Sequence, residues 1–435
     1  MTINDCCNHA EVRVDPARWP DVAAPRGGRL RALAAGRLFA TATRRLPVSI
    51  EYPRPRRDRT RSGSPRSGEV LPRMIIRDPQ ALYRRIGSDG LIGFGEAFMA
   101  GDWTTDDLVG VLTPFAERVA DLVPAPLQKL RSLVLPGHPD DERNTVANTR
   151  SNIARHYDLS NDLFGAFLDE TLSYSSAYFG TDAAADTATW GDLAAAQRAK
   201  IDRLLDQAEV GPGTRLLEIG TGWGELCLRA AERGARVRSL TLSSEQRDLA
   251  RTRIAAAGYA EQVHVDLLDY RLVDGEYDAV VSVEMLEAVG REYWPEYFQT
   301  VQRVLAPGGK AAIQVITMPH DRMLASGSTY TWVHKYIFPG GQLPSIEALR
   351  DVVSAATDLT MTDELAMGRH YARTLRLWRE RFLAQSATIG RLGFDAVFER
   401  MWTFYLAYSE AGFRSGYLDV YQLRLDKPAT RGGPD

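Results

Sequence analysis

The chain has 435 residues, of which 44% are hydrophobic and 25% are charged, and its formal net charge is −3. This length exceeds that of one compact domain, and the composition argues against disorder of the whole chain. The small net charge gives no global attraction to nucleic acid, and three cysteines are too few for a disulfide framework or a cysteine metal site. We therefore expect no metal and no nucleic-acid partner.

The N-terminal stretch lacks the apolar core of a signal peptide, and no run in the sequence approaches the ~18 to 20 apolar residues that span a bilayer. We expect a protein of the reducing cytoplasm. Any membrane contact would then be peripheral, on the inner face of the plasma membrane.

The first 135 residues are expected to form a small α+β domain. Two alternating segments, 46–52 and 70–78, predict strands that flank a basic insertion at 53–68. This insertion has the composition of a solvated loop, but it could also dock on anionic lipid at about 1 kcal/mol per basic residue. Its arginines are Arg54, Arg56, Arg57, Arg59, Arg61 and Arg66. Helical segments follow to about residue 135, and we expect the domain to dock on lipid or to form a subunit contact in a homo-oligomer.

Residues 136–435 are expected to form a second domain, with regular α/β texture from about residue 148. Strands are predicted at 215–220, 236–243, 263–269, 277–286 and 310–317, and helices at 194–210, 225–234 and 244–258. This alternation predicts a doubly wound, Rossmann-like parallel sheet with its ligand at the carboxyl ends of the strands. Residues from about 318 to 421 are rich in aromatics and helical periods, which suggests a cap over the sheet edge.

A glycine-rich turn follows the first strand of this sheet, in the pattern E-x-G-x-G-x-G. Glu218 precedes Gly220, Gly222 and Gly224, and Glu225 stands where a dinucleotide fingerprint would require glycine. An acid at 218 would repel a pyrophosphate but suits the cationic end of S-adenosylmethionine (SAM). The sequence therefore predicts SAM binding rather than a purely structural turn. At the end of the next strand lie Thr241, Leu242 and Gln246, whose neutral amide can serve the ribose hydroxyls.

Several separated motifs carry a family resemblance. "HYDLSNDLFGAFLDETLSYSSAYF" (His156 to Phe179), "LLEIGTGWGE", "LTLSSEQ" and "KYIFPGGQLPS" (Lys335 to Ser345) resemble the cyclopropane-fatty-acyl-phospholipid synthases and the related mycolic acid methyltransferases. "GFGEAFMAGDW" (Gly93 to Trp103) extends the resemblance to the longer, phospholipid-acting branch. The resemblance implies a class I SAM-dependent methyltransferase. Its cofactor contacts would fall on Tyr174, Ser175, Gly220, Gly222, Thr241, Leu242, Gln246, Asp269 and Tyr270.

The resemblance also implies that a bicarbonate ion acts as the base in the cyclopropane synthases. Its ligands would correspond to the Ser176 main chain, Glu287, Gln314, the Ile316 main chain and Tyr371. The chain departs from the family pattern at two of these positions, because Gln314 replaces a histidine and Ser176 replaces a cysteine. Whether bicarbonate still binds is left open. Further departures are Ser409 in place of a cysteine once regarded as catalytic, Ala288 in place of a common histidine, and an extra acid at Glu284.

Methylation of a cis alkene by a sulfonium leaves a carbocation on the neighbouring carbon, which negative charge and aromatic faces can stabilise. Direct proton loss from the new methyl group closes a cyclopropane ring, whereas a prior hydride shift gives an exocyclic methylene group. Similarity to actinobacterial members favours a 10-methylene chain on an unsaturated phospholipid, which a separate flavin-dependent reductase would saturate. The alternatives are a cyclopropane synthase, a non-lipid or nucleic-acid methyltransferase, and an inactive lipid-binding protein.

Overall fold

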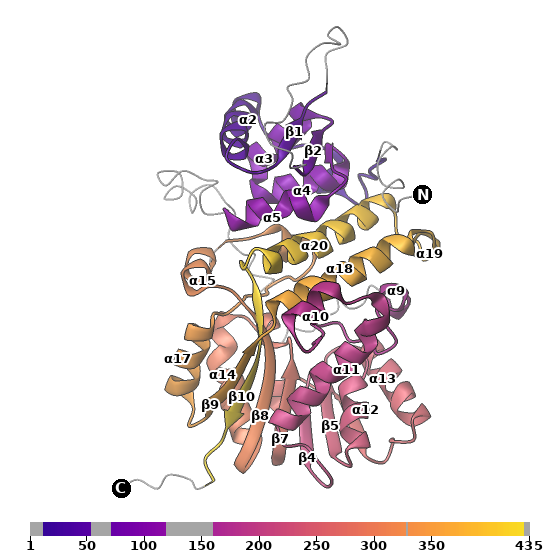
Figure 1. Ribbon diagram of the computed structural model, residues 1–435, viewed down its shortest axis with the longest axis vertical. Coiled ribbons are helices and arrows are strands. Elements are labelled where there is room, and N and C mark those ends of the chain that lie inside the picture. Colours follow the sequence, from indigo (N-terminus) through magenta and orange to yellow (C-terminus); the bar gives the residue numbers. More distant parts are fainter. Residues whose placement is uncertain (1–11, 54–70, 119–159, 328, 430–435) are drawn as a thin grey trace. The chain divides into compact units, whose positions relative to one another are not determined.

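The computed structural model in Figure 1 describes residues 12–53, 71–118, 160–327 and 329–429. Most of the basic insertion at 53–68 and the expected domain boundary near residue 135 lie outside these residues. Within the described residues the chain divides into two compact units. The first contains the N-terminal residues to 118 together with 330–332 and 382–415, and the second contains the rest. Residues 382–415 thus group with the N-terminal segment, although the predicted boundary placed them in the cap of the second domain.

The first unit combines a small sheet with helices, as the sequence predicted. Its sheet has the order β1-β2-β3, in which β1 and β2 are parallel and β3 is antiparallel to β2. The two strands predicted around the basic insertion are β1 and β2. The strands are β1 (Ser49–Glu51), β2 (Arg73–Ile76) and β3 (Trp103–Thr104). The helices are α1 (Pro20–Ala23), α2 (Arg29–Thr43), α3 (Pro79–Asp89), α4 (Leu91–Ala100), α5 (Leu108–Glu117), α19 (Ser386–Arg391) and α20 (Ala396–Arg414).

Aromatic packing joins α20 to the N-terminal elements of this unit. The Phe404 ring centroid lies 5.5 Å from that of Phe98 and 6.5 Å from that of Trp103. The buried Arg400 guanidinium donates to the main-chain oxygens of Phe98, at 2.7 Å, and Trp103, at 3.2 Å. These contacts between segments about 300 residues apart explain why residues 382–415 belong to the first unit.

The second unit is built on a mixed sheet with the strand order β6-β5-β4-β7-β8-β10-β9 (Figure 1). The strands from β6 to β8 are parallel, which confirms the predicted Rossmann-like fold. The strands are β4 (Arg215–Ile219), β5 (Arg236–Thr241), β6 (Val263–Leu267), β7 (Tyr277–Val283), β8 (Leu305–Thr317), β9 (Thr360–Ala366) and β10 (Asp419–Asp426). The α-helices are α9 (Asn161–Phe167), α10 (Asp182–Thr187), α11 (Trp190–Gln207), α12 (Glu225–Glu232), α13 (Ser244–Ala256), α14 (Trp294–Val304), α15 (His320–Ser326) and α17 (Ile346–Ala356), together with most of α16 (Trp332–Tyr336) and α18 (Gly368–Ala384).

The expectation of a wholly parallel sheet is wrong at one edge. β10 is antiparallel to β8, and β9 is antiparallel to β10. β9 falls within the suggested cap of about 318–421, and β10 begins at the end of that cap. Because β10 pairs with β8 across about a hundred residues of chain, its place depends on long-range pairing that local periodicity does not report.

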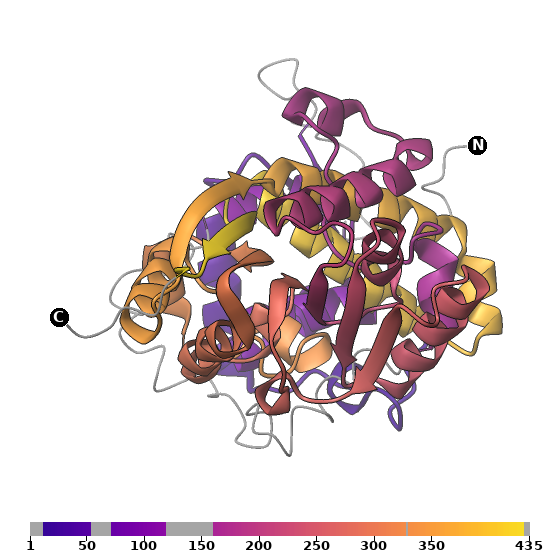
Figure 2. The same cartoon turned by 90° about the horizontal axis from the view of Figure 1, so that it is seen from below.

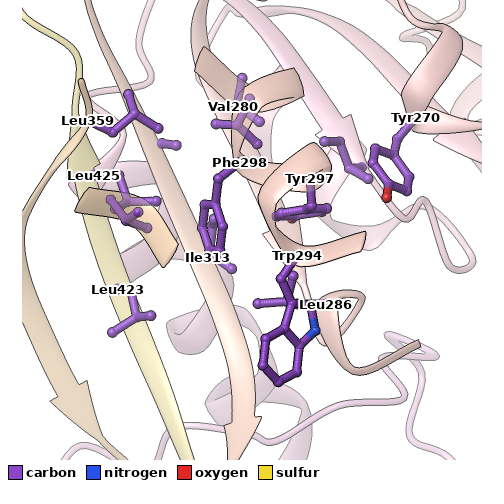
Figure 3. Close-up of a cluster of buried hydrophobic side chains, with 14 of the residues drawn as sticks. Tyr270, Val280, Leu286, Trp294, Tyr297, Phe298, Ile313, Leu359, Leu423 and Leu425 are labelled. Carbon is purple, nitrogen blue, oxygen red and sulfur yellow. The ribbon is translucent and has the colours of Figure 1, made fainter. Parts of the chain in front are cut away.

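Helices cover both faces of the sheet, as Figure 2 shows from below. One buried cluster joins α11, α12 and α13 to side chains such as Leu216, Val237 and Val281. A second joins α14 and α17 to the opposite face, where Trp294 and Phe298 lie near Ile313 (Figure 3). The alternation of strand side chains between the two clusters is that of a doubly wound sheet buried on both faces. Among the described helices, none is both long and apolar enough to cross a membrane.

The first turn of α13 offers a local test of this fold. The Ser243 hydroxyl accepts a hydrogen bond from the Gln246 N–H at 3.2 Å and so caps the helix. Loss of such a cap costs about 1 kcal/mol. We expect Ser243→Ala to lower the Tm by a few degrees at most, as measured by calorimetry. Ser244→Ala, one residue inside the helix, serves as the control, and equal melting temperatures for the two variants would contradict the capping role.

Candidate active site

The predicted glycine turn lies between β4 and α12. Gly220, Gly222 and Gly224 have φ angles of +101°, +52° and +88°, a region that side-chain-bearing residues rarely adopt. A Cβ on Gly220 would lie 2.5 Å from the Met285 Cγ, whereas no described atom lies within 4 Å of a Cβ on Gly222. The turn therefore brings bare backbone to the carboxyl end of β4, at the N-terminus of α12.

Glu218 lies beneath this turn. Its side chain is buried, and its Oε2 accepts hydrogen bonds from the Ser239 hydroxyl at 2.5 Å and the Cys227 thiol at 2.9 Å. The Ser239 hydroxyl also lies 2.6 Å from the Thr221 hydroxyl. Burial raises the pKa of Glu218 to about 7. The Glu218 carboxyl group thus links β4, β5 and α12 through hydrogen bonds, and the contact between Ser239 and Thr221 connects this network to the glycine turn.

The next two strands place the other predicted cofactor residues along the same edge of the sheet. After β5, the Thr241 hydroxyl donates to the Gln246 side-chain oxygen at 3.1 Å. The side chain of Leu242, which follows Thr241, is half-buried. After β6, the Asp269 carboxylate accepts from the Arg271 Nε at 2.9 Å and from its terminal nitrogen at 2.6 Å. Because β6, β5 and β4 are adjacent and parallel, these turns and the glycine turn share one edge.

Tyr270, which the sequence predicted as a cofactor contact, has a buried side chain. Its side chain is buried in the cluster of Figure 3, and its ring centroid lies 5.3 Å from that of Tyr297. Its hydroxyl is buried and has no hydrogen-bond partner among the described residues. Burial raises the pKa of Tyr270, so the phenol is neutral at physiological pH.

The segment Tyr174 to Ser176 is held against α11. The Gln197 side-chain amide donates to the Ser175 carbonyl at 2.9 Å, and the Lys200 ammonium donates to the Ser175 hydroxyl at 2.5 Å. The Tyr174 ring lies 5.1 Å from Phe164 and 5.3 Å from Trp378, between centroids. An aromatic wall thus adjoins the predicted cofactor segment.

Two acids follow β7 and form the electrostatic centre of the site. Glu287 is 9% exposed, and its Oε1 accepts a short hydrogen bond from the Ile316 N–H. Its Oε2 is buried and has no hydrogen-bond partner among the described residues. Burial, followed by repulsion from Glu284, raises the pKa of Glu287 to about 8. Loss of hydration also raises the pKa of Glu284, although its hydrogen bonds oppose that shift.

The Glu284 carboxylate accepts hydrogen bonds from three of the residues that the sequence predicted around the base. Its Oε1 accepts from the Ser176 N–H at 2.9 Å and from the Gln314 amide at 2.8 Å. Its Oε2 accepts from the Tyr371 hydroxyl at 2.7 Å. The five positions predicted around a base are therefore brought together, but three of them bond to an acid that had been noticed only as an extra residue.

The sequence interpretation missed two further members of the site. Lys200 is 1% exposed, and burial lowers the pKa of its ammonium to about 8 against the opposing attraction of Glu284. Gln422, on β10, donates to the Gln314 side-chain oxygen at 3.0 Å. A lysine on the apolar face of α11 was a usable signal in the sequence, but Gln422 depends on the unpredicted edge strand.

Comparison with known proteins identifies the family. The profile described as mycolic acid cyclopropane synthetase matches residues 144–423. The tuberculostearic acid methyltransferase UfaA1 of Mycobacterium tuberculosis is 55% identical over 418 residues, which cover 95% of this chain and 96% of that protein. The cyclopropane-fatty-acyl-phospholipid synthase of Escherichia coli is 30% identical over 86% of this chain and 92% of its own length.

Solved structures agree with the sequence relatives. The mycolic acid cyclopropane synthase CmaA1, complexed with SAH and CTAB, superposes with a TM-score of 0.58 at 33% identity, covering 64% of this chain and 98% of that one. The cyclopropane synthase MmaA2 from Mycobacterium tuberculosis gives the same TM-score and coverage. Since the profile spans more than half of the chain and the relatives align over most of it, the chain belongs to the mycolic acid cyclopropane synthetase family and is a SAM-dependent methyltransferase.

Proposed function

We propose that the enzyme transfers the SAM methyl group to the cis double bond of an unsaturated, oleoyl-type phospholipid acyl chain and releases a 10-methylene branched chain. The observation that carries this proposal is the pair of acids, Glu284 and Glu287, beside the glycine turn. Alkylation of an alkene must end with loss of a C–H proton, and a buried carboxylate can take it. The relative named a tuberculostearic acid methyltransferase supports the branched product over a ring.

The residues divide the work between binding and charge. Bound SAM supplies an electrophilic methyl group. The turns after β4, β5 and β6 would hold it through Gly220, Gly222, Gly224, Thr241, Leu242, Gln246, Asp269 and the Tyr270 main chain, with Tyr174 and Ser175 on the opposite side. An ionised Glu287 would stabilise the cation on the acyl chain. The ring of Tyr371, 6.2 Å from that of Trp378 between centroids, would add an aromatic face and exclude water.

The product itself provides the test. We expect the purified protein, incubated with SAM and dioleoyl phospholipid vesicles without reductant, to yield fatty acids whose NMR spectrum contains vinylidene protons. Vesicles of fully saturated phospholipid serve as the control and should accept no methyl group. High-field cyclopropane protons would show instead that the enzyme closes a ring, which is the second candidate that the E. coli relative supports.

Three further roles belong to this proposal. A separate flavin-dependent reductase would saturate the methylene group. The N-terminal domain would dock on the anionic inner face of the plasma membrane through the arginines of 53–68, or would form a subunit contact. The acyl chain would be received by aromatic residues of the predicted cap that belong to the second unit, such as Tyr371 and Trp378.

A further inference from the structure

We propose that Glu284 is the catalytic base of this enzyme and replaces the bicarbonate ion that the family resemblance implies. The inference rests on the proposed function, because it concerns the proton lost from the methylated acyl chain. It assigns the base to a side chain of the protein, so that no dissolved ion is required.

The donors that would hold bicarbonate are already used by the protein. The Ser176 N–H, the Gln314 amide and the Tyr371 hydroxyl each donate to the Glu284 carboxylate, within 2.7 to 2.9 Å. The Ile316 N–H donates to Glu287. Of the five positions implied as bicarbonate ligands, one is the acid Glu287, and the other four each donate a hydrogen bond to Glu284 or Glu287. A second anion placed among them would lose its donors and be repelled by two carboxyl groups, so the residues present do not fit bicarbonate.

The orientation of the Gln314 amide is fixed by a chain of contacts. The Lys200 carbonyl oxygen can only accept, and it accepts from the Gln422 amide at 3.1 Å. The same nitrogen of Gln422 donates to the Gln314 side-chain oxygen at 3.0 Å. Gln314 must therefore present its NH₂ group to Glu284. A glutamine does not titrate, so this donor is constant over the physiological pH range, unlike the histidine that the family resemblance implies at this position.

The hydrogen bonds favour Glu284 as an ionised base with one free position. The Ser176 N–H and the correctly oriented Gln314 amide can only donate, so Oε1 is held as an acceptor. Oε2 accepts from Tyr371 alone among the contacts above, which leaves a lone pair for a proton. The buried Lys200 ammonium attracts the same carboxylate. Glu287, by contrast, accepts from the Ile316 N–H through Oε1, while its Oε2 has no hydrogen-bond partner among the described residues.

Glu284 is also placed next to the predicted methyl donor. Its neighbour Met285 occupies the space that a Cβ on Gly220 would need, so the chain at 284–285 lies against the glycine turn. Glu284 accepts a hydrogen bond from the main-chain N–H of Ser176. Ser176 directly follows Ser175, which is a predicted cofactor contact. A positive φ of +52° at Glu284 turns the chain after β7 into this position, a strained conformation that often marks functional sites.

In the proposed reaction, methyl transfer is followed by a hydride shift and by loss of a proton to Glu284. The alkene π electrons form a bond to the methyl carbon as the S–CH₃ bond breaks, which leaves S-adenosylhomocysteine and a carbocation on the acyl chain. A hydride shift moves the cation to the methylated carbon. Glu284 Oε2 then takes a proton from the new methyl group, and the C–H electron pair becomes the C=CH₂ bond. The resulting carboxylic acid releases its proton to water before the next turnover.

The test compares activity with and without bicarbonate. We expect the wild-type enzyme, assayed by transfer of labelled methyl to dioleoyl phospholipid, to keep its rate in CO₂-free buffer and to gain nothing from added bicarbonate. Glu284→Gln should lose at least about 100-fold in kcat, the usual scale for removal of a general base, while binding SAM with unchanged affinity. Glu292 is an exposed acid that follows Glu287 in the chain, and Glu292→Gln should retain the wild-type rate.

Glu284→Ala provides a second variant, because it releases the three donors. We expect bicarbonate or formate to restore part of its activity. A wild-type rate that falls when bicarbonate is removed would overturn the inference without any variant, as would a Glu284→Gln enzyme within threefold of wild type. These outcomes differ from failure of the proposed function, in which the wild-type enzyme would transfer no methyl group to the lipid under any condition.

Discussion

Glu287→Gln is expected to reduce methyl transfer by at least about 100-fold and, at the same time, to raise the Tm. Glutamine keeps the oxygen that accepts from the Ile316 N–H, so the local geometry is preserved. It cannot carry the negative charge that a carbocation favours, and loss of one such electrostatic contact typically costs about 10² to 10³ in rate. The stability gain arises because Glu287 is a buried acid with an unpaired oxygen.

The pH dependence of that gain follows from the pKa of Glu287, which burial raises from 4.5 to about 8. Between these pH values the unfolded chain has lost a proton that the folded chain retains, so this group makes the wild-type protein less stable as pH rises. Glutamine does not titrate. The difference in stability should therefore widen by up to about 1.4 kcal/mol per pH unit.

Calorimetry at pH 5.5, 6.5 and 7.5, beside the labelled-methyl assay, measures both effects of Glu287→Gln. Glu292→Gln is the matched control and should shift neither. A Tm difference that is constant across pH would show that Glu287 is not a buried titrating acid. Full activity in Glu287→Gln would limit the residue to a structural role.

Gly220→Ala is expected to weaken SAM binding at least tenfold and to reduce activity in proportion. The φ of +101° at Gly220 is strained for alanine, and the new methyl group would meet the Met285 side chain 2.5 Å away. Relief of that contact would displace either the glycine turn or residue 285, next to Glu284. Both displacements disturb the approach of the cofactor to the sheet edge.

Isothermal titration of SAM measures the affinity of Gly220→Ala. Gly258→Ala is the matched control, because Gly258 has a φ of +84° but no described atom within 4 Å of the added Cβ. It should lose a similar amount of stability from backbone strain while binding SAM normally. If both variants bind SAM equally well, the close approach at Gly220 is not needed by the cofactor.

The parallel half of the sheet and the glycine turn could be predicted because their signals are local. Strands β4 to β8 contain runs or alternations of apolar residues, and the glycines follow the first of these strands directly. The amphipathic helix α14 also had a local signal, in Trp294, Phe298 and Val301, but it was not among the predicted elements. Strands β9 and β10 could not be predicted in the same way, since pairing with distant strands defines them.

In the candidate site, too, the residues marked by local motifs could be predicted, whereas a role that depends on a long-range contact could not. Family motifs identified Ser176, Gln314 and Tyr371, and the structure brings all three together. The role of Glu284 could not be read from its spacing to Glu287, because it depends on a contact with Ser176, 108 residues away. That contact exists because a left-handed residue ends β7, which no propensity at position 284 predicts.

The position of β10 between β8 and β9 has a consequence for synthesis on the ribosome. A nascent chain that has not yet released residues 419–426 can assemble the cofactor turns of β4, β5 and β6, but it lacks the Gln422 that orients Gln314. During that interval β8 is an open sheet edge, and β9 has no strand to pair with. Such edges recruit strands from other chains. Chaperone binding and aggregation should therefore be greatest for chains stalled just short of β10. A chain shortened at its C-terminus before β10 would bind SAM but would not catalyse methyl transfer.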